Sequence, residues 1–283
     1  MQKYPKTDGE FTFTKMCFGR NTAYVCGWFL VVAYLTTVPM NSTAIGLIVD
    51  GLDESADILK WGLHYQVAGY DVWLGEMLLA MGILILFGIL NILGVKKAGI
   101  VQTILAALLG ISVVTLTIAA LVSSKTSLAN MAPWWGVHKS DAIAAWTNGT
   151  YTSIGEFANS GTVGAVSSAV LLGIMGFYLA SSRLMYSMSR DGYLPEIFSV
   201  IDKKHGTPKN AMIFCIIISL SGPILGREAL GWFVDMSAIG ASIGYFFTCA
   251  SALVTMKRDG DGTVFLKTMA TIGVVFYVKQ MKK

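Results

Sequence analysis

Long apolar runs alternate with short polar segments from one end of this chain to the other. A helix that crosses the hydrocarbon core of a bilayer needs about 20 mostly apolar residues. Six runs meet or approach that length: Tyr24–Val49, Val72–Val95, Ala98–Val122, Thr162–Met185, Ala211–Leu225 and Leu230–Met256. A seventh run, Gly262–Val278, is shorter and weaker, so we expect it to be an incomplete span.

The pattern favours helices over a barrel. Lipid offers the backbone no hydrogen-bond partner, so a spanning segment must satisfy its own N–H and C=O groups. The alternation of apolar and polar residues that marks barrel strands does not recur along the chain. The sequence therefore predicts an all-α integral membrane protein with six transmembrane helices and a weak seventh, in a single membrane domain over residues 1–283.

Composition strengthens this interpretation. Apolar residues make up 54% of the 283 and charged residues only 13%, whereas an average soluble domain carries about 25% charge. The mean hydropathy is +0.61. A chain this apolar cannot hide its surface from water in one soluble core, so its first partner is the lipid bilayer.

The distribution of positive charge predicts an orientation. With a cytoplasmic N-terminus and six alternating spans, 14 of the 21 Lys and Arg residues lie inside and 4 lie outside. Loops with excess Lys and Arg stay cytoplasmic. We therefore expect a protein of the plasma (cytoplasmic) membrane, with residues 123–160 forming a polar extracellular or periplasmic segment and residues 181–210 a cytoplasmic loop.

The start of that cytoplasmic loop has the residues of a helix end. Glycine permits a left-handed backbone and proline bars continuation, so Gly192 and Pro195 should stop the helix that precedes them. We expect one of two nearby arginines to pair with Asp191 or Glu196, or to cap helix carbonyls, and so to hold the turn at the headgroup level. The residues of this structural motif are Arg183, Arg190, Asp191, Gly192 and Pro195.

The order of residues in the loop resembles that of the amino acid–polyamine–organocation (APC) permeases. Residues 182–211 read SRLMYSMSRDGYLPEIFSVIDKKHGTPKNA, similar to the stretch after the eighth helix of that family. Three further stretches are similar: Tyr4–Trp28 to the start of the third helix, Asn91–Leu105 to the turn between the fourth and fifth, and Leu230–Tyr245 to the tenth.

The resemblance implies part of the inverted-repeat, leucine-transporter-type fold. Residues 24–122 match family helices three to five, and residues 161–283 match helices eight to ten with a partial eleventh. The first two helices of each repeat have no counterpart here. The implied function is transport of an amino acid or organic amine, by a form of the permease that is truncated. The alternative is an inactive helical scaffold, or a fragment that requires a partner chain.

Polar residues inside two apolar runs are candidates for a substrate or ion pathway. They are Thr37, Asn41, Ser42, Ser181 and Ser182. The first three surround Pro39, which frees a helix carbonyl. Their side chains could line a pathway, or they could satisfy freed carbonyls and bond across helices. The resemblance places the two serines of the later run near the coupling-ion site of the family.

Other chemistry finds little support in the sequence. Gly240 and Gly244 form a GxxxG motif, which predicts close helix packing inside the chain or, less commonly, with a partner chain or a second copy. His and Cys residues are scattered without metal-ligand or catalytic spacing, so we expect no metal, no cofactor and no enzyme activity. The basic residues do not interleave with aromatics as they do in nucleic-acid binders.

Overall fold

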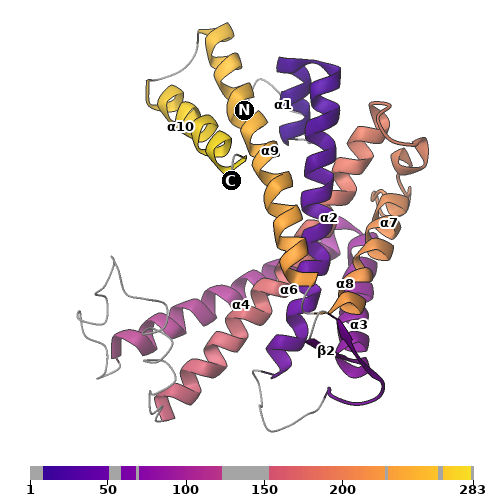
Figure 1. Cartoon of the computed structure of the whole chain (residues 1–283), viewed down its shortest axis with the longest axis vertical. Coiled ribbons are helices and arrows are strands. Elements are labelled where there is room, and N and C mark those ends of the chain that lie inside the picture. Colours follow the sequence, from indigo (N-terminus) through magenta and orange to yellow (C-terminus); the bar gives the residue numbers. More distant parts are fainter. Residues whose placement is uncertain are drawn as a thin grey trace.

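The computed structural model describes residues 9–50, 59–67, 70–122, 153–226, 229–260 and 264–281. The elements are α1 (Gly9–Phe18), α2 (Arg20–Asp50), β1 (His64–Val67), β2 (Tyr70–Trp73), α3 (Leu74–Ile92), α4 (Val95–Val122), α6 (Ser153–Arg190), η2 (Glu196–Ser199), α7 (Lys209–Ser219), α8 (Ser221–Leu225), α9 (Ala229–Asp259) and α10 (Val264–Met281). Figure 1 shows a helical bundle in which α2 lies at the centre. The predicted all-α membrane class is confirmed.

Among the described residues, five helices are long and apolar enough to cross a membrane: α2, α3, α4, α6 and α9. The run Ala211–Leu225, predicted as one further span, instead forms two short helices that meet at Leu220. Pro223 has no N–H, and its ring displaces the carbonyl of the residue four positions before it, so a continuous helix is interrupted here. The apolar part of α10 is too short to count as a candidate span.

Several boundaries differ from the predicted ones. Helix α6 begins at Ser153, within the polar segment predicted over residues 123–160; residues 123–152 of that segment lie outside the described residues. The sequence also gave no indication of α1 or of the antiparallel hairpin β1–β2. In that hairpin the rings of His64 and Trp73 lie opposite one another and stack with centroids 4.8 Å apart.

Glycines on neighbouring helices let α2 occupy the centre. A Cβ at Gly240 of α9 would overlap the backbone carbonyl of Phe29, and one at Gly244 would overlap the side chain of Leu30. The GxxxG motif is therefore used inside the chain, against α2. Self-association through these two glycines, which the sequence left open, is not available while α2 covers them.

Helix α4 has a different environment. Only 6% of its apolar window is buried, compared with 56% for α2. It packs along α6, where Gly176 lies against Gln102. In Figure 1 α4 and the first half of α6 leave the rest of the bundle together.

Candidate functional site

The polar residues of α2 bond to carbonyls of their own helix. Thr37 donates to the carbonyl of Ala33 (2.7 Å) and pairs with the hydroxyl of Ser237 on α9 (2.8 Å). Asn41 donates from Nδ2 to the carbonyl of Thr37 (2.8 Å), and Ser42 donates to that of Pro39 (2.7 Å). The carbonyl that Pro39 frees is that of Leu35, four residues before it, so these three bonds go to other carbonyls of the helix.

Two of these side chains also face neighbouring helices. The amide of Asn41 lies against Gly173 of α6, where a Cβ would stand 3.0 Å from Nδ2. The Thr37–Ser237 pair joins α2 to α9. Thr37 and Asn41 therefore lie in the contact regions that join α2 to the rest of the bundle, whereas Ser42 is fully buried.

The serines of α6 face a different neighbour. Ser181 donates to the carbonyl of Phe177 (2.7 Å) and lies 3.4 Å from the thiol of Cys215 on α7. Ser182 donates to the carbonyl of Leu179 (3.2 Å). Both serines are fully buried. The described contacts join neither serine to the three candidates on α2, and a pathway role for the five residues remains a prediction.

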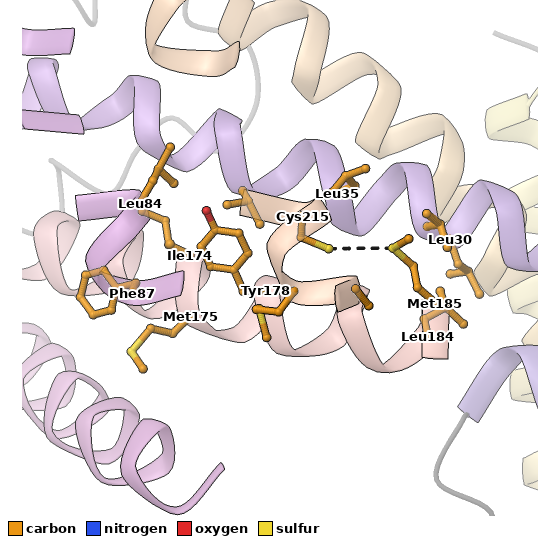
Figure 2. Packing of buried hydrophobic residues seen from close by; sticks show 14 of the residues in the cluster. Leu30, Leu35, Leu84, Phe87, Ile174, Met175, Tyr178, Leu184, Met185 and Cys215 are labelled. Carbon is orange, nitrogen blue, oxygen red and sulfur yellow. Dashed lines mark hydrogen bonds between the residues drawn. The ribbon is translucent and has the colours of Figure 1, made fainter. Parts of the chain in front are cut away.

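Two buried polar residues were not singled out from the sequence. Figure 2 shows Tyr178 of α6 among Leu84, Ile174 and Cys215. Within the described residues its hydroxyl has no hydrogen-bond partner; Ser219 lies nearby and donates its own hydroxyl to the carbonyl of Cys215 (2.7 Å). Asn91 of α3 donates from Nδ2 to the carbonyl of Phe87 (2.9 Å), but its Oδ1 is likewise buried without a partner there. Buried polar atoms are usually hydrogen-bonded, so these two atoms, like the buried hydroxyls of Ser187 and Ser251, are unusual among the described residues.

The turn after α6 forms a regular helix C-cap. Gly192 has a φ of 79°, the left-handed conformation expected of it. Its N–H bonds the carbonyl of Ser189 (3.0 Å), and the N–H of Tyr193 bonds that of Met188 (2.9 Å). This is the Schellman arrangement. Pro195 lies just before η2, and its carbonyl accepts a hydrogen bond from the hydroxyl of Ser189 (2.6 Å).

The acidic residue of this turn has a partner other than the two expected. Asp191 accepts from Nζ of Lys15 on α1 at 2.6 Å, rather than from one of the nearby arginines as predicted. Arg190 instead lies over the ring of Tyr186, 5.7 Å from its centroid, and the side chain of Arg183 is exposed. The correction matters because the ion pair joins the turn to the N-terminal part of the chain.

Tyr193 extends this junction, which we call the clasp: Lys15, Arg20, Tyr24, Asp191 and Tyr193. The ring of Tyr193 stacks on that of Tyr24 (centroids 6.0 Å apart), and its hydroxyl donates to the carbonyl of Arg20 (3.3 Å). The cationic groups of Lys15 and Arg20 lie 5.8 and 5.3 Å from the same ring. Cation–π contacts at exposed sites contribute about 0.5–1 kcal/mol each, so the clasp fixes the start of α2 to the end of α6.

Comparison with known families indicates the same family as the residue motifs of the predicted cytoplasmic loop. The sequence matches the amino acid permease family over residues 2–160 and 152–279. The chain belongs to the amino acid permease family. The family is one of membrane permeases and not of enzymes. Within the described residues, no group of three or more His, Cys, Asp and Glu side chains could hold a metal ion.

A bacterial transporter is similar to part of the chain. The chain is 29% identical over 103 residues to the "Glutamate/serine transporter AimA" of Bacillus subtilis (strain 168). The alignment covers 34% of this chain and 19% of the relative. The two family matches cover the segments that resemble helices three to five and eight to ten, but the correspondence of individual helices remains a prediction.

Proposed function

We propose that this chain moves an amino acid or an organic amine across a membrane. The observation that carries the proposal is the family match, which spans nearly all of the chain in two segments. The bundle of apolar helices supports it, since five of them are long enough to cross a bilayer. The relative's name makes glutamate and serine the substrates to test first.

Uptake into proteoliposomes tests this proposal. The purified chain is reconstituted, and entry of radiolabelled glutamate, serine and a panel of amines is compared with entry into empty liposomes. Saturable uptake of one substrate class is the expected result. Absence of uptake for the whole panel, with a protein that remains helical and monodisperse, would contradict the carrier proposal.

A matched pair of threonine variants tests the pathway residues. Thr37 and Thr103 both donate to the carbonyl four residues before them, at 2.7 and 2.8 Å. Thr37 is buried between α2 and α9, whereas Thr103 is exposed on α4. We expect Thr37→Ala to lower uptake and Thr103→Ala to leave it unchanged. Equal uptake in both variants would remove Thr37 from the pathway.

A second candidate function is a helical scaffold that works only with a partner chain. The specific observation in its favour is the exposure of α4: within the described residues, only 6% of its apolar window is buried. Since α2 covers Gly240 and Gly244, a partner chain would meet α4 instead. A folded protein without uptake, whose uptake is restored by a co-purified chain, would favour this function.

The orientation completes the proposal. We place the N-terminus in the cytoplasm, on the excess of Lys and Arg in the segments assigned to the inside. The membrane that we propose is the plasma membrane. Lys203→Cys and Leu63→Cys form a matched pair for labelling intact cells with an impermeant thiol reagent, since both positions are exposed. Above the labelling of the parent, only the Leu63→Cys protein should react; labelling of Lys203→Cys alone would reverse the orientation.

A further inference from the structure

Two segments far apart in sequence meet at the end of α3. The first is the turn from α3 to α4, residues 92–97, and the second is the loop of residues 195–209 that leads into α7. The hydroxyl of Thr207 donates to the carbonyl of Ile92 (3.0 Å). The carbonyl of His205 lies beside Gly94, 3.5 Å from the place of a Cβ. The loop is therefore held on the turn between two candidate spans, which lies at the membrane surface.

This contact gathers positive charge. The two segments carry five exposed lysines, which we call the lysine surface: Lys96, Lys97, Lys203, Lys204 and Lys209. They carry two acids, Asp202 and Glu196. The carboxylate of Asp202 is engaged within the loop, because it accepts from the His205 ring (2.6 Å) and from the backbone N–H of Lys204 (3.0 Å).

Helix ends add to the positive field. Both α4 and α7 begin here, at Val95 and Lys209. The N-terminus of a helix carries unsatisfied N–H groups and about half a positive charge. A group with negative charge at this place would therefore face lysine side chains from two segments and the ends of two helices.

The same surface also presents apolar side chains to the outside. Val95, Ile197, Val200 and Ile201 are 38%, 58%, 55% and 42% exposed. Ile197 is held next to α7, since the amide of Asn210 donates to its carbonyl (2.9 Å). Lysines beside exposed aliphatic residues at the end of membrane spans suit a ligand with an anionic head and an apolar body.

We propose that the lysine surface binds an anionic phospholipid, whose headgroup phosphate contacts the lysines while its acyl chains follow the exposed apolar residues. Each Lys or Arg near a membrane surface contributes about 1 kcal/mol of attraction to anionic lipid. This proposal rests on the membrane class of the chain and is independent of whether the chain transports a substrate.

The test measures lipid binding to the delipidated full chain in non-ionic detergent. Native mass spectrometry counts bound lipids during titration with phosphatidylglycerol or with zwitterionic phosphatidylcholine, and thermal unfolding is followed in parallel. We expect phosphatidylglycerol to bind and to raise the melting temperature at concentrations where phosphatidylcholine does neither. Soluble glycerol phosphate should not compete, because it has no apolar body.

Three double variants locate the site, and each changes the net charge by the same amount. K96E/K97E and K203E/K204E should each weaken phosphatidylglycerol binding by at least about thirtyfold, since each loses two lysines. K257E/K267E, at two exposed positions on α9 and α10, should leave the binding within about twofold of the parent if the lysine surface is the site. The K203Q/K204Q protein, in which the two lysines are neutralised, should show an intermediate loss of phosphatidylglycerol binding. It controls for misfolding caused by charge reversal.

Three outcomes would overturn the proposal. Equal loss in all three charge-reversal variants would show attraction to net charge alone. Equal binding of phosphatidylglycerol and phosphatidylcholine would remove the anionic headgroup from the recognition. Competition by glycerol phosphate at the affinity of the lipid would assign the surface to a soluble anion instead.

Discussion

Helices α2 and α4 are both apolar enough to span a membrane, yet α2 is surrounded by other helices and α4 is almost entirely exposed. The share of the apolar window that is buried is 56% in α2 and 6% in α4. Glycines explain much of the difference. Helices α6, α8 and α9 present Gly173, Gly222 and Gly240 to α2, and in each case a Cβ would press on an α2 atom. Around Gly99 and Gly110 of α4 there is open space.

The contacts at the starts of α2 and α4 also differ. The start of α2 is joined to the end of α6 by the clasp, with an ion pair, an aromatic stack and cation–π contacts. The turn before α4 receives the loop that leads into α7, through a hydrogen bond from the hydroxyl of Thr207 to the carbonyl of Ile92 at the end of α3. The comparison teaches that hydropathy selects the helices that enter a membrane, whereas small residues and polar ends decide which helix becomes the centre.

The largest expected effect comes from filling a glycine contact of α2. A side chain at Gly240 would overlap the backbone carbonyl of Phe29, and backbone cannot move aside as a side chain can. We expect Gly240→Leu to lower the free energy of unfolding by about 3 kcal/mol. Thermal unfolding and the monodisperse fraction in size-exclusion chromatography measure the effect.

Gly110→Leu is the matched control for this change. It adds the same side chain to a helical glycine of α4 with no atom within 4 Å, so its melting temperature should stay close to that of the parent. If both variants were destabilised equally, the proposed distinction between a packed α2 and an open α4 would fail.

The fold was predictable to the extent that local features determine it. The lengths of apolar runs predicted all five candidate spans, because crossing a bilayer is a requirement of each segment alone. The central position of α2 was not predictable, since it depends on which glycines of distant segments meet it. The same limit applies to α8, whose Gly222 lies against Pro39.

In the candidate site, too, features set by neighbouring residues could be predicted, whereas contacts between distant segments could not. The left-handed conformation of Gly192 followed from the residue types around it. The partner of its neighbour Asp191 was not among the residues considered, because Lys15 is 176 positions away and the arginines are nearby. Tyr178 and Asn91 were missed because their unpartnered atoms are visible only when the surrounding helices are in place.

The next effect concerns the turn that carries the clasp. Gly192 has positive φ, which costs an L-residue roughly 1–2 kcal/mol and is worst for β-branched side chains. Gly192→Val should lower the free energy of unfolding by about that amount, and Gly192→Asn by less, because asparagine tolerates this conformation. Thermal unfolding of the two variants compares them at one position. Equal melting temperatures for both and the parent would show that the turn does not hold α2 to α6.

A smaller effect is expected from the ion pair of the clasp. Lys15 and Asp191 are 40% and 25% exposed, and exposed pairs contribute about 0–1 kcal/mol. A double-mutant cycle of Lys15→Met and Asp191→Asn should give a coupling energy of at most about 1 kcal/mol, decreasing as salt is added. A coupling that persists at high salt would indicate that the pair is shielded from solvent and that the clasp is tighter than its exposure implies.

The smallest effect concerns the loop that anchors the start of α4. The hydrogen bond from His205, followed by that from the N–H of Lys204, lowers the pKa of Asp202, so the folded protein favours the carboxylate. This stabilisation is present above the ordinary aspartate pKa of about 3.9 and is lost as the pH falls through the lowered value. Asp202→Asn should therefore reduce the melting temperature slightly at pH 7.

The pH profile separates this contact from a purely steric change. The difference in melting temperature between the Asp202→Asn protein and the parent should begin to shrink below about pH 3.9, where the unfolded parent takes up a proton at Asp202. It should disappear once the pH is below the lowered pKa of the folded state. Glu196→Gln removes an exposed carboxylate from the same loop and serves as the control for net charge. A difference that stays constant from pH 8 to pH 3 would mean that the hydrogen bonds of the carboxylate do not hold the loop, and that Thr207 alone fixes it to the end of α3.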